Sequence, residues 1–168
     1  MRVLMVSKAC YVAAYRRKLE EMARFEDIDL TLVVPESWGT GAKAAKLEPG
    51  FDAGYRLIAS QPVLSGKHHL HWYPALGEIV RHLRPDVIHI DEEPYDWVTV
   101  HALLKARASG AKTLFFTWQN LDRRFPPPFA WFERYTLSRV DAAIAGNEEA
   151  AAILRRRGFQ KPLIVLPQ

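Results

Sequence analysis

Acidic side chains follow an apolar run near the middle of the sequence. Residues 87–90 read Val-Ile-His-Ile, and Asp91, Glu92 and Glu93 come directly after them. Like charges this close raise one another's pKa, which prepares a carboxylate to act as a general base or to bind sugar hydroxyls. The alternative for Glu93 is that it only opens the helix that begins near Pro94. Metal binding by the three carboxylates is a weaker hypothesis.

A second polar segment follows the apolar run at residues 113–116. It contains a bulky aromatic residue, Trp118, and two primary amides, Gln119 and Asn120. Such residues can stack on and hydrogen-bond a polyhydroxylated ligand, and amides stay uncharged over the whole working pH range. The alternatives are a core position for Trp118 and a turn cap for Asn120. Arg123, in the loop beyond, is a candidate for phosphate contact or for plain solvation.

Polar residues also stand at two other places where an apolar run is followed by a predicted helix. Lys8 and Tyr11 follow the first apolar run, where the amides of the next helix can meet an anion, although a solvated turn explains Lys8 equally simply. Asn147 is a good helix N-cap, and Glu148 stands in the first turn, where the helix dipole favours acids.

Other chemistry has little support. His68, His69 and His71 match no common zinc spacing, so we expect a surface loop. Cys10 is the single cysteine, which excludes an internal disulfide, favours a reducing compartment and predicts a buried structural thiol. No hydrolase elbow, P-loop or zinc-protease motif occurs, and residues 7–11 lack the glycines of a classical NAD site.

Short apolar runs alternate with segments of helical period along the whole chain. Most of the runs are β-branched without polar alternation, as in strands buried on both faces of a parallel sheet. They predict seven strands, at residues 3–6, 30–34, 56–59, 87–90, 113–116, 142–145 and 163–166. Apolar stripes predict five helices, at residues 11–25, 72–83, 95–108, 129–137 and 147–157. Residues 35–54 are expected to form a long loop.

This alternation predicts an α/β fold, a Rossmann-like, doubly wound, mainly parallel sheet of about seven strands with helices on both faces. Ligands of such sheets bind beyond the carboxyl ends of the strands, where all the candidates above lie. The 168 residues, 49% hydrophobic and 25% charged, are typical of one globular domain. The net charge is +4, and the basic residues are interspersed with acidic ones. No apolar run approaches the length that a membrane span needs.

Five segments occur in an order and spacing that together point to a family. They are residues 84–90, residues 92–94, residues 113–120, residues 141–149 and residues 158–167. This set resembles the N-terminal half of a family 4 (group 1) glycosyltransferase of the GT-B fold, over nearly the whole chain. Two features depart from the family pattern. The usual glycine-rich first turn is replaced by Lys8-Ala9-Cys10, and Gln119 stands where many members have a histidine near the transferred sugar.

The resemblance implies transfer of a sugar from a nucleotide-sugar to a glycan or lipid-linked acceptor, with retention, without a metal or other cofactor, and with the leaving phosphate helping to deprotonate the acceptor. It implies that residues 1–168 form a single acceptor-side domain, lacking the C-terminal nucleotide-sugar-binding domain and inactive alone. No catalytic residue is expected in this domain. The substrate-binding candidates are Lys8, Tyr11, Glu93, Trp118, Gln119, Asn120, Arg123, Asn147 and Glu148.

The single cysteine and the absence of a visible export signal predict a cytoplasmic location. Peripheral membrane contact through Trp38, Trp72 and the pair Arg123-Arg124 is a further hypothesis, and a nucleic-acid partner is not expected. Two alternatives stay open: the N-terminal half of a nucleotide-sugar 2-epimerase-like GT-B enzyme, and a non-catalytic Rossmann-like binding module.

Overall fold

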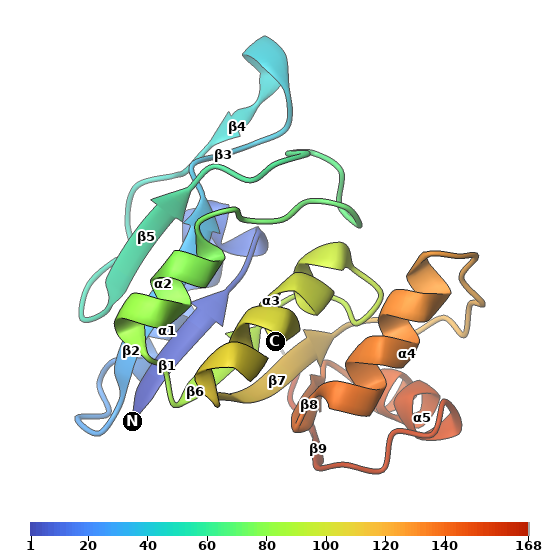
Figure 1. Cartoon of the computed structure of the whole chain (residues 1–168). Coiled ribbons are helices and arrows are strands. Elements are labelled where there is room, and N and C mark those ends of the chain that lie inside the picture. The colour runs from blue at the N-terminus through green and yellow to red at the C-terminus, as the bar shows by residue number, and fades with distance from the viewer. Residues whose placement is uncertain (168) are drawn as a thin grey trace.

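A seven-stranded parallel sheet forms the centre of the computed structural model, which describes residues 1–167 (Figure 1). The strand order is β5-β2-β1-β6-β7-β8-β9, and every neighbouring pair is parallel. The strands are β1 (Arg2–Val6), β2 (Asp29–Pro35), β5 (Arg56–Ser60), β6 (Val87–Ile90), β7 (Lys112–Thr117), β8 (Ala142–Ala145) and β9 (Leu163–Val165). All seven predicted strands are confirmed.

The five predicted helices are present with altered bounds. They are α1 (Arg17–Met22), α2 (Leu76–Leu83), α3 (Trp97–Ser109), α4 (Phe129–Arg139) and α5 (Glu148–Arg156). The first is much shorter than predicted because the buried Arg16 guanidinium binds the carbonyls of Cys10 and Gly50, which keeps the preceding turns in a 3-10 form. The second begins late because Trp72 is paired with Val63 in an isolated β-bridge.

The segment predicted to be a long loop contains a small sheet of its own. Strands β3 (Ser37–Trp38) and β4 (Ala45–Lys46) pair antiparallel around a short 3-10 turn. The reason is tertiary, since the Trp38 ring is buried against the rings of His68 and His71 from a later loop. Figure 1 shows this hairpin projecting from the top of the molecule.

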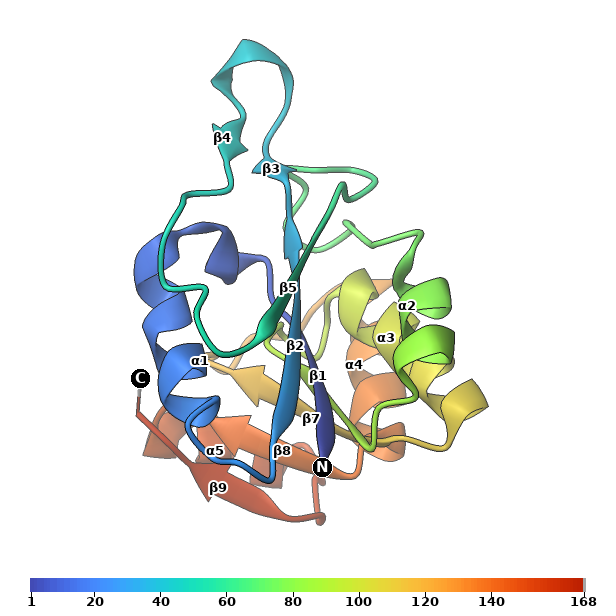
Figure 2. The same ribbon diagram turned by 90° about the vertical axis from the view of Figure 1, so that its left-hand side faces the viewer.

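Helices cover the two faces of the sheet unequally. Right-handed crossovers place α1 on one face, beside β1 and β2, and α2, α3 and α4 on the other (Figure 2). The main core lies on that second face, where α2 and α3 pack on β1, β6 and β7. The α5 helix continues this layer at the β8 and β9 end through small alanine side chains. Helices on both faces are therefore confirmed.

The helix ends agree with their sequence signals. Asn147 Oδ1 accepts a hydrogen bond from the backbone N–H of Ala150 at 2.8 Å, so it is the N-cap of α5. Gly110 takes the left-handed conformation that ends α3, as its position after the apolar stripe predicts. No helix within residues 1–167 has the length and apolar character needed to cross a lipid bilayer.

Replacing the N-cap, Asn147→Ala, is expected to lower the free energy of unfolding by about 1 kcal/mol, because the Ala150 N–H loses its acceptor. Urea unfolding followed by circular dichroism measures this. Asn120→Ala is the control, since the exposed Asn120 side chain makes no hydrogen bond within residues 1–167 and its loss should leave stability unchanged. Equal stability of Asn147→Ala and the wild type would contradict the assignment of the cap.

Candidate functional site

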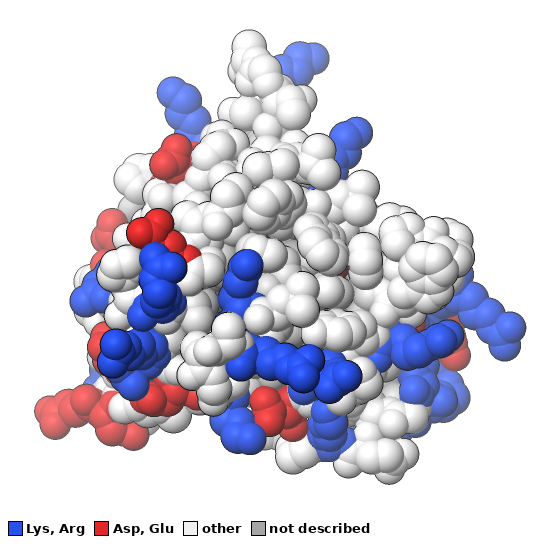
Figure 3. Space-filling model, in the orientation of Figure 1, with Lys and Arg blue, Asp and Glu red and all other residues white. Residues whose placement is uncertain are grey.

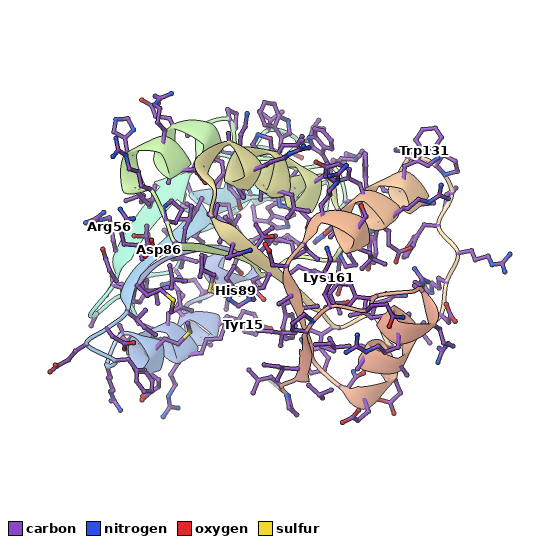
Figure 4. All side chains as sticks on the ribbon, turned by 60° about the horizontal axis from the view of Figure 1, so that its bottom comes forward. Tyr15, Arg56, Asp86, His89, Trp131 and Lys161 are labelled. Carbon is purple, nitrogen blue, oxygen red and sulfur yellow. The ribbon has the colours of Figure 1, made fainter. Side chains whose placement is uncertain are left out.

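Three loops meet beyond the carboxyl ends of β1, β6 and β7, at the edge where parallel α/β sheets bind ligands. They enclose a pocket of about 260 Å³ lined by Lys8, Ala9, Tyr15, Lys18, Asp91, Glu92, Glu93, Phe116 and Trp118. Three of the predicted substrate-binding residues are therefore brought together here. An apolar groove of about 860 Å³ continues from the pocket along the uncovered sheet face, beside Tyr15 and His89 (Figure 4).

An ion cluster of one partly exposed lysine and two buried carboxylates adjoins the pocket. The Lys8 ammonium contacts the carboxylate of Glu92 and lies 3.6 Å from Oδ2 of Asp96. The backbone N–H of Lys8 also donates to Glu92 Oε1 at 2.6 Å. Burial lowers the pKa of Lys8, but the two carboxylates outweigh it and raise the pKa above its usual value. The lysine predicted to meet phosphate is thus already paired with carboxylates.

The three consecutive acidic residues, Asp91, Glu92 and Glu93, have different surroundings. Burial is the main cause that raises the pKa of Glu92 and of Glu93 to about 7 each, whereas the sequence suggested repulsion between neighbouring charges. Asp91 instead accepts hydrogen bonds from Ser7 Oγ at 2.8 Å and Lys18 Nζ at 3.4 Å. These carboxylates face different partners, and no cluster suited to a metal ion occurs among the described residues.

Glu93 fixes the loop that follows β7. Its Oε2 accepts a hydrogen bond from Thr117 Oγ1 at 2.5 Å, and its Oε1 accepts one from the backbone N–H of Trp118 at 2.9 Å. Glu93 therefore does more than open the next helix, because it joins the loop after β6 to the loop after β7. The carboxylate that the sequence placed near acceptor hydroxyls lines the pocket and sets the position of its aromatic residue.

Trp118 lies across the turn that follows β8. The side chain is 44% exposed, so the core position is excluded. Its ring rests on Gly146, where a Cβ atom would come within 2.6 Å of the indole carbons. A glycine is required here by this close contact. Trp118 thus presents an open, fixed aromatic surface at the rim of the pocket.

Gln119 and its neighbours continue this rim. Gln119 Oε1 accepts a hydrogen bond from the Tyr95 hydroxyl at 3.3 Å, and its Nε2 donates to the carbonyl of Leu121 at 2.5 Å. Asn120 and Arg123 are exposed and lie outside the pocket lining. Their predicted ligand contacts remain predictions.

The remaining predicted residues lie at the margins. Asn147 uses its side-chain oxygen to cap α5, and Glu148 is exposed in the first turn of that helix. Tyr11 is half-buried, and its carbonyl accepts a hydrogen bond from the backbone of Glu48. Asn147 and Glu148 follow Gly146 directly and so stay near the Trp118 ring, whereas Tyr11 is absent from the pocket lining.

The sequence matches the family described as "Glycosyl transferase 4-like domain" over residues 12–167. The chain belongs to this family. A search of curated protein sequences finds no significant match. The glycosyl transferase 4-like domain thus accounts for nearly the whole chain, and the resemblance to the N-terminal half of a GT-B glycosyltransferase is confirmed.

Solved structures share the fold of this glycosyl transferase 4-like domain at low identity. A sucrose-phosphate synthase structure from Thermosynechococcus elongatus has a TM-score of 0.62 and 14% identity, with 100% of this chain and 89% of that chain covered. The UDP-GlcNAc 2-epimerase from Neisseria meningitidis bound to UDP-GlcNAc has a TM-score of 0.60 and 16% identity, with 98% of this chain and 46% of that chain covered. The UDP-GlcNAc 2-epimerase from Methanocaldococcus jannaschii has a TM-score of 0.56 and 15% identity, with 98% of this chain and 44% of that chain covered. The chain thus spans less than half of these epimerases.

The histidine-rich loop was only partly predicted. His68 and His69 are exposed as expected, but His71 is fully buried, and burial lowers its pKa to about 4. His69 Nδ1 lies 2.7 Å from Asp96 Oδ1. The spacing of these histidines held no signal for this pair, because Asp96 comes from the beginning of a different helix.

Two other predictions concern burial. Cys10 is buried, as predicted, and burial raises the pKa of its thiol to about 11. Trp38 is 9% exposed, so the prediction that it contacts a membrane was wrong. Trp72 is half-buried against the ring of His101, which leaves Arg123 and Arg124 as the exposed members of that predicted surface.

Basic side chains gather at the edge of the sheet away from the pocket. In the view of Figure 3, Lys and Arg gather along the lower part of the molecule, where the helices on that face end. Arg81, Arg107 and Arg139 stand in the last turns of α2, α3 and α4, where the helix dipole favours bases. The carboxyl edge above them shows few charges in this view. Helix polarity thus places these bases at the edge away from the pocket.

Adding a methyl group beneath the indole, Gly146→Ala, is expected to displace the Trp118 ring, because a Cβ cannot occupy a point 2.6 Å from its carbons. Fluorine NMR of the 5-fluorotryptophan protein measures the effect, with the Trp118 signal assigned from Trp118→Phe. Gly77→Ala is the matched control, since its Cβ would meet only the flexible Lys105 side chain at 3.3 Å. An unchanged Trp118 signal in Gly146→Ala would refute the contact.

Burial of Glu93 predicts a specific dependence of stability on pH. A folded pKa of about 7 exceeds the usual 4.5, so the folded protein binds the proton more tightly. The contribution of this group to the free energy of unfolding is then fully present below the unfolded pKa. It is lost as the pH rises through the folded pKa, and the whole loss is about 3 kcal/mol. Relative to Glu93→Gln, the wild type should lose unfolding free energy between about pH 4.5 and about pH 7. Parallel pH profiles of the two proteins in urea unfolding would contradict this.

Proposed function

We propose that this glycosyl transferase 4-like domain forms the acceptor side of an enzyme that transfers a sugar from a nucleotide-sugar to a glycan or lipid-linked acceptor. The observation that supports it most is the fixed Trp118 ring at the rim of a pocket with several charged lining residues, on the carboxyl edge of the sheet. Family membership over residues 12–167 gives the reaction class.

The chemistry of the pocket suits a polyhydroxylated ligand. An indole ring offers a flat apolar surface to the faces of a sugar, and the surrounding groups offer hydrogen bonds to its hydroxyls. Asp91, Lys18 and Tyr15 line the same pocket. The amide of Gln119 stands next along the rim, held by Tyr95 and the Leu121 carbonyl. A glycan is therefore the acceptor class that these residues fit.

The donor is proposed to bind mainly through another domain. The loop after β1 has no glycine, and its Lys8 ammonium is neutralised by Glu92 and Asp96, so this loop offers little to a diphosphate. The transfer is proposed to need no metal or other cofactor. Within this scheme the chain alone binds acceptor and does not transfer sugar.

A second candidate is the corresponding half of a nucleotide-sugar 2-epimerase. The fold similarity to such epimerases favours it, although identities of 16% and 15% establish only the fold. An epimerase has no acceptor, so it should bind nucleotide-sugars and ignore glycans. Nucleotide binding alone would also fit a non-catalytic Rossmann-like module.

Titration calorimetry distinguishes these functions. The chain is titrated with mannose, galactose and N-acetylglucosamine oligosaccharides, and separately with UDP- and GDP-sugars. Oligosaccharide binding is expected, and Trp118→Ala should weaken it about tenfold, because loss of an aromatic contact costs about 1.4 kcal/mol. Trp131→Ala is the control, since this 61% exposed indole on α4 lies outside the pocket.

Two outcomes would refute the proposal. One is binding of nucleotide-sugars without binding of any oligosaccharide. The other is measurable sugar transfer by the 168-residue chain, because that would place the donor site within these residues.

A further inference from the structure

A further groove lies between α4 and α5, at the β8 and β9 end of the sheet (Figure 1). Its volume is about 650 Å³, and the loop after β7 supplies part of its wall. None of its lining residues belongs to the pocket beside Trp118 or to the apolar groove that continues from that pocket. We call it the α4–α5 groove, and its chemistry is separate from that of the proposed acceptor site.

Four arginines from three segments line the α4–α5 groove. They are Arg124 in the loop after β7, Arg134 on α4, and Arg156 and Arg157 where α5 ends. The lining contains only two acidic residues, Asp122 and Glu133, so its formal charge is +2. Figure 3 shows basic side chains exposed at this end of the molecule. An anion is the kind of ligand that such a lining attracts.

The two acidic residues are engaged by the arginines at the end of α5. The Arg157 guanidinium contacts the carboxylate of Glu133 and lies 3.1 Å from Oδ1 of Asp122. Nη2 of Arg156 lies 3.4 Å from Oδ2 of the same aspartate. The negative charge in the groove is therefore already shared between these two arginines.

Arg124 and Arg134 carry the excess positive charge. Both are exposed, and neither forms an ion pair or a hydrogen bond within residues 1–167. Helix polarity does not explain their positions, because Arg134 stands in the middle of α4 and Arg124 precedes that helix. A base favoured by the helix dipole stands in a last turn, as Arg156 does on α5. The guanidinium groups of Arg124 and Arg134 are thus free to receive a ligand.

Arg157 gives the groove an ordered wall. Its side chain is 16% exposed, and it donates a hydrogen bond to the carbonyl of Arg123. Its guanidinium lies 5.9 Å from the centroid of the Phe125 ring, and that ring stacks on Tyr95 at a centroid distance of 4.1 Å. A ligand therefore meets a surface that is ordered before it binds, which lowers the entropy cost of binding.

We propose that the α4–α5 groove is a binding site for a phosphate-bearing anion, either a diphosphate or a phosphate ester. The guanidinium group presents its N–H donors in a planar fork that matches the oxygens of phosphate. Two negative charges on the ligand balance the formal charge of +2 on the lining. Arg124 and Arg134 bind the phosphate oxygens, beside the wall that Arg157 orders. This site does not depend on the proposed sugar transfer.

Titration with inorganic pyrophosphate tests the site. Calorimetry is run in about 0.15 M salt, where the Debye length is about 8 Å and attraction by distant charges is screened. The wild type is expected to bind pyrophosphate. The double variant Arg124→Gln/Arg134→Gln should bind it about tenfold more weakly or worse, because the two unpaired guanidinium donors are lost.

Arg17→Gln/Arg56→Gln is the matched control. It removes the same charge from two exposed arginines that form no ion pair within residues 1–167. Arg17 begins α1 on the other face of the sheet, and Figure 4 shows Arg56 far from Trp131 on α4. Its affinity for pyrophosphate should equal that of the wild type. Equal affinities of the two double variants, or a wild type that does not bind, would overturn the proposal.

Backbone amide NMR of the wild-type chain locates the anion even if a variant fails to fold. Pyrophosphate should shift the signals of residues 122–125, 133–134 and 156–158. The signals of residues 91–93, beside Trp118, should stay unchanged. Shifts confined to that pocket would contradict the site.

Vesicles of phosphatidylglycerol distinguish a lipid headgroup from a soluble ligand, since both present phosphate to the same arginines. Sedimentation of the chain with the vesicles, reversed by pyrophosphate, would identify the headgroup as the ligand. Pyrophosphate binding without sedimentation would identify a soluble ligand. In either case Arg124→Gln/Arg134→Gln must lose the binding, and its retention would overturn the site.

The same variant separates this site from the proposed function. Nucleotide-sugars contain a diphosphate, so the α4–α5 groove is able to bind them. Nucleotide-sugar binding that Arg124→Gln/Arg134→Gln abolishes belongs to the groove, whereas binding that it keeps counts against the proposed function. If oligosaccharides bind and pyrophosphate does not, the acceptor site stands and the phosphate site fails.

Discussion

The ion pair of Lys8 and Glu92 is the constraint on which the carboxyl edge depends. The Glu92 carboxylate is buried and accepts hydrogen bonds from both the backbone and the ammonium of Lys8. Removing the Lys8 ammonium would leave the buried Glu92 carboxyl group without its counter-charge, which is destabilising. The pair joins the loops after β1 and β6, and the same ammonium reaches Asp96 at the beginning of α3.

Two ring side chains are positioned by acidic residues that follow β6. The next residue along the chain, Glu93, fixes the loop after β7 and with Gly146 orients the Trp118 indole. Asp96 orients the His69 imidazole. The acidic residues between β6 and α3 thus position both an indole and an imidazole.

Local patterns predicted the framework well and its irregular parts poorly. The apolar runs found all seven strands, because burial on both faces of a parallel sheet imposes an unbroken apolar sequence. Asn147 and Gly110 marked real helix ends, since caps depend on neighbouring backbone groups. The first helix was predicted too long and the β3–β4 hairpin was missed. In both cases a distant contact, from Arg16 or to Trp38, overrides the local preference.

The sequence by itself determined the parallel α/β sheet, its domain class and the edge at which the polar residues gather, because chain order and right-handed crossovers bring the strand ends together. Only the tertiary structure decided which groups are neighbours there. Lys8 and Glu92 are 84 residues apart in the chain, and His69 and Asp96 are 27 apart. The pKa values of Glu92 and Glu93 depend on burial, and burial is a property of the whole packed molecule that no short stretch of sequence contains.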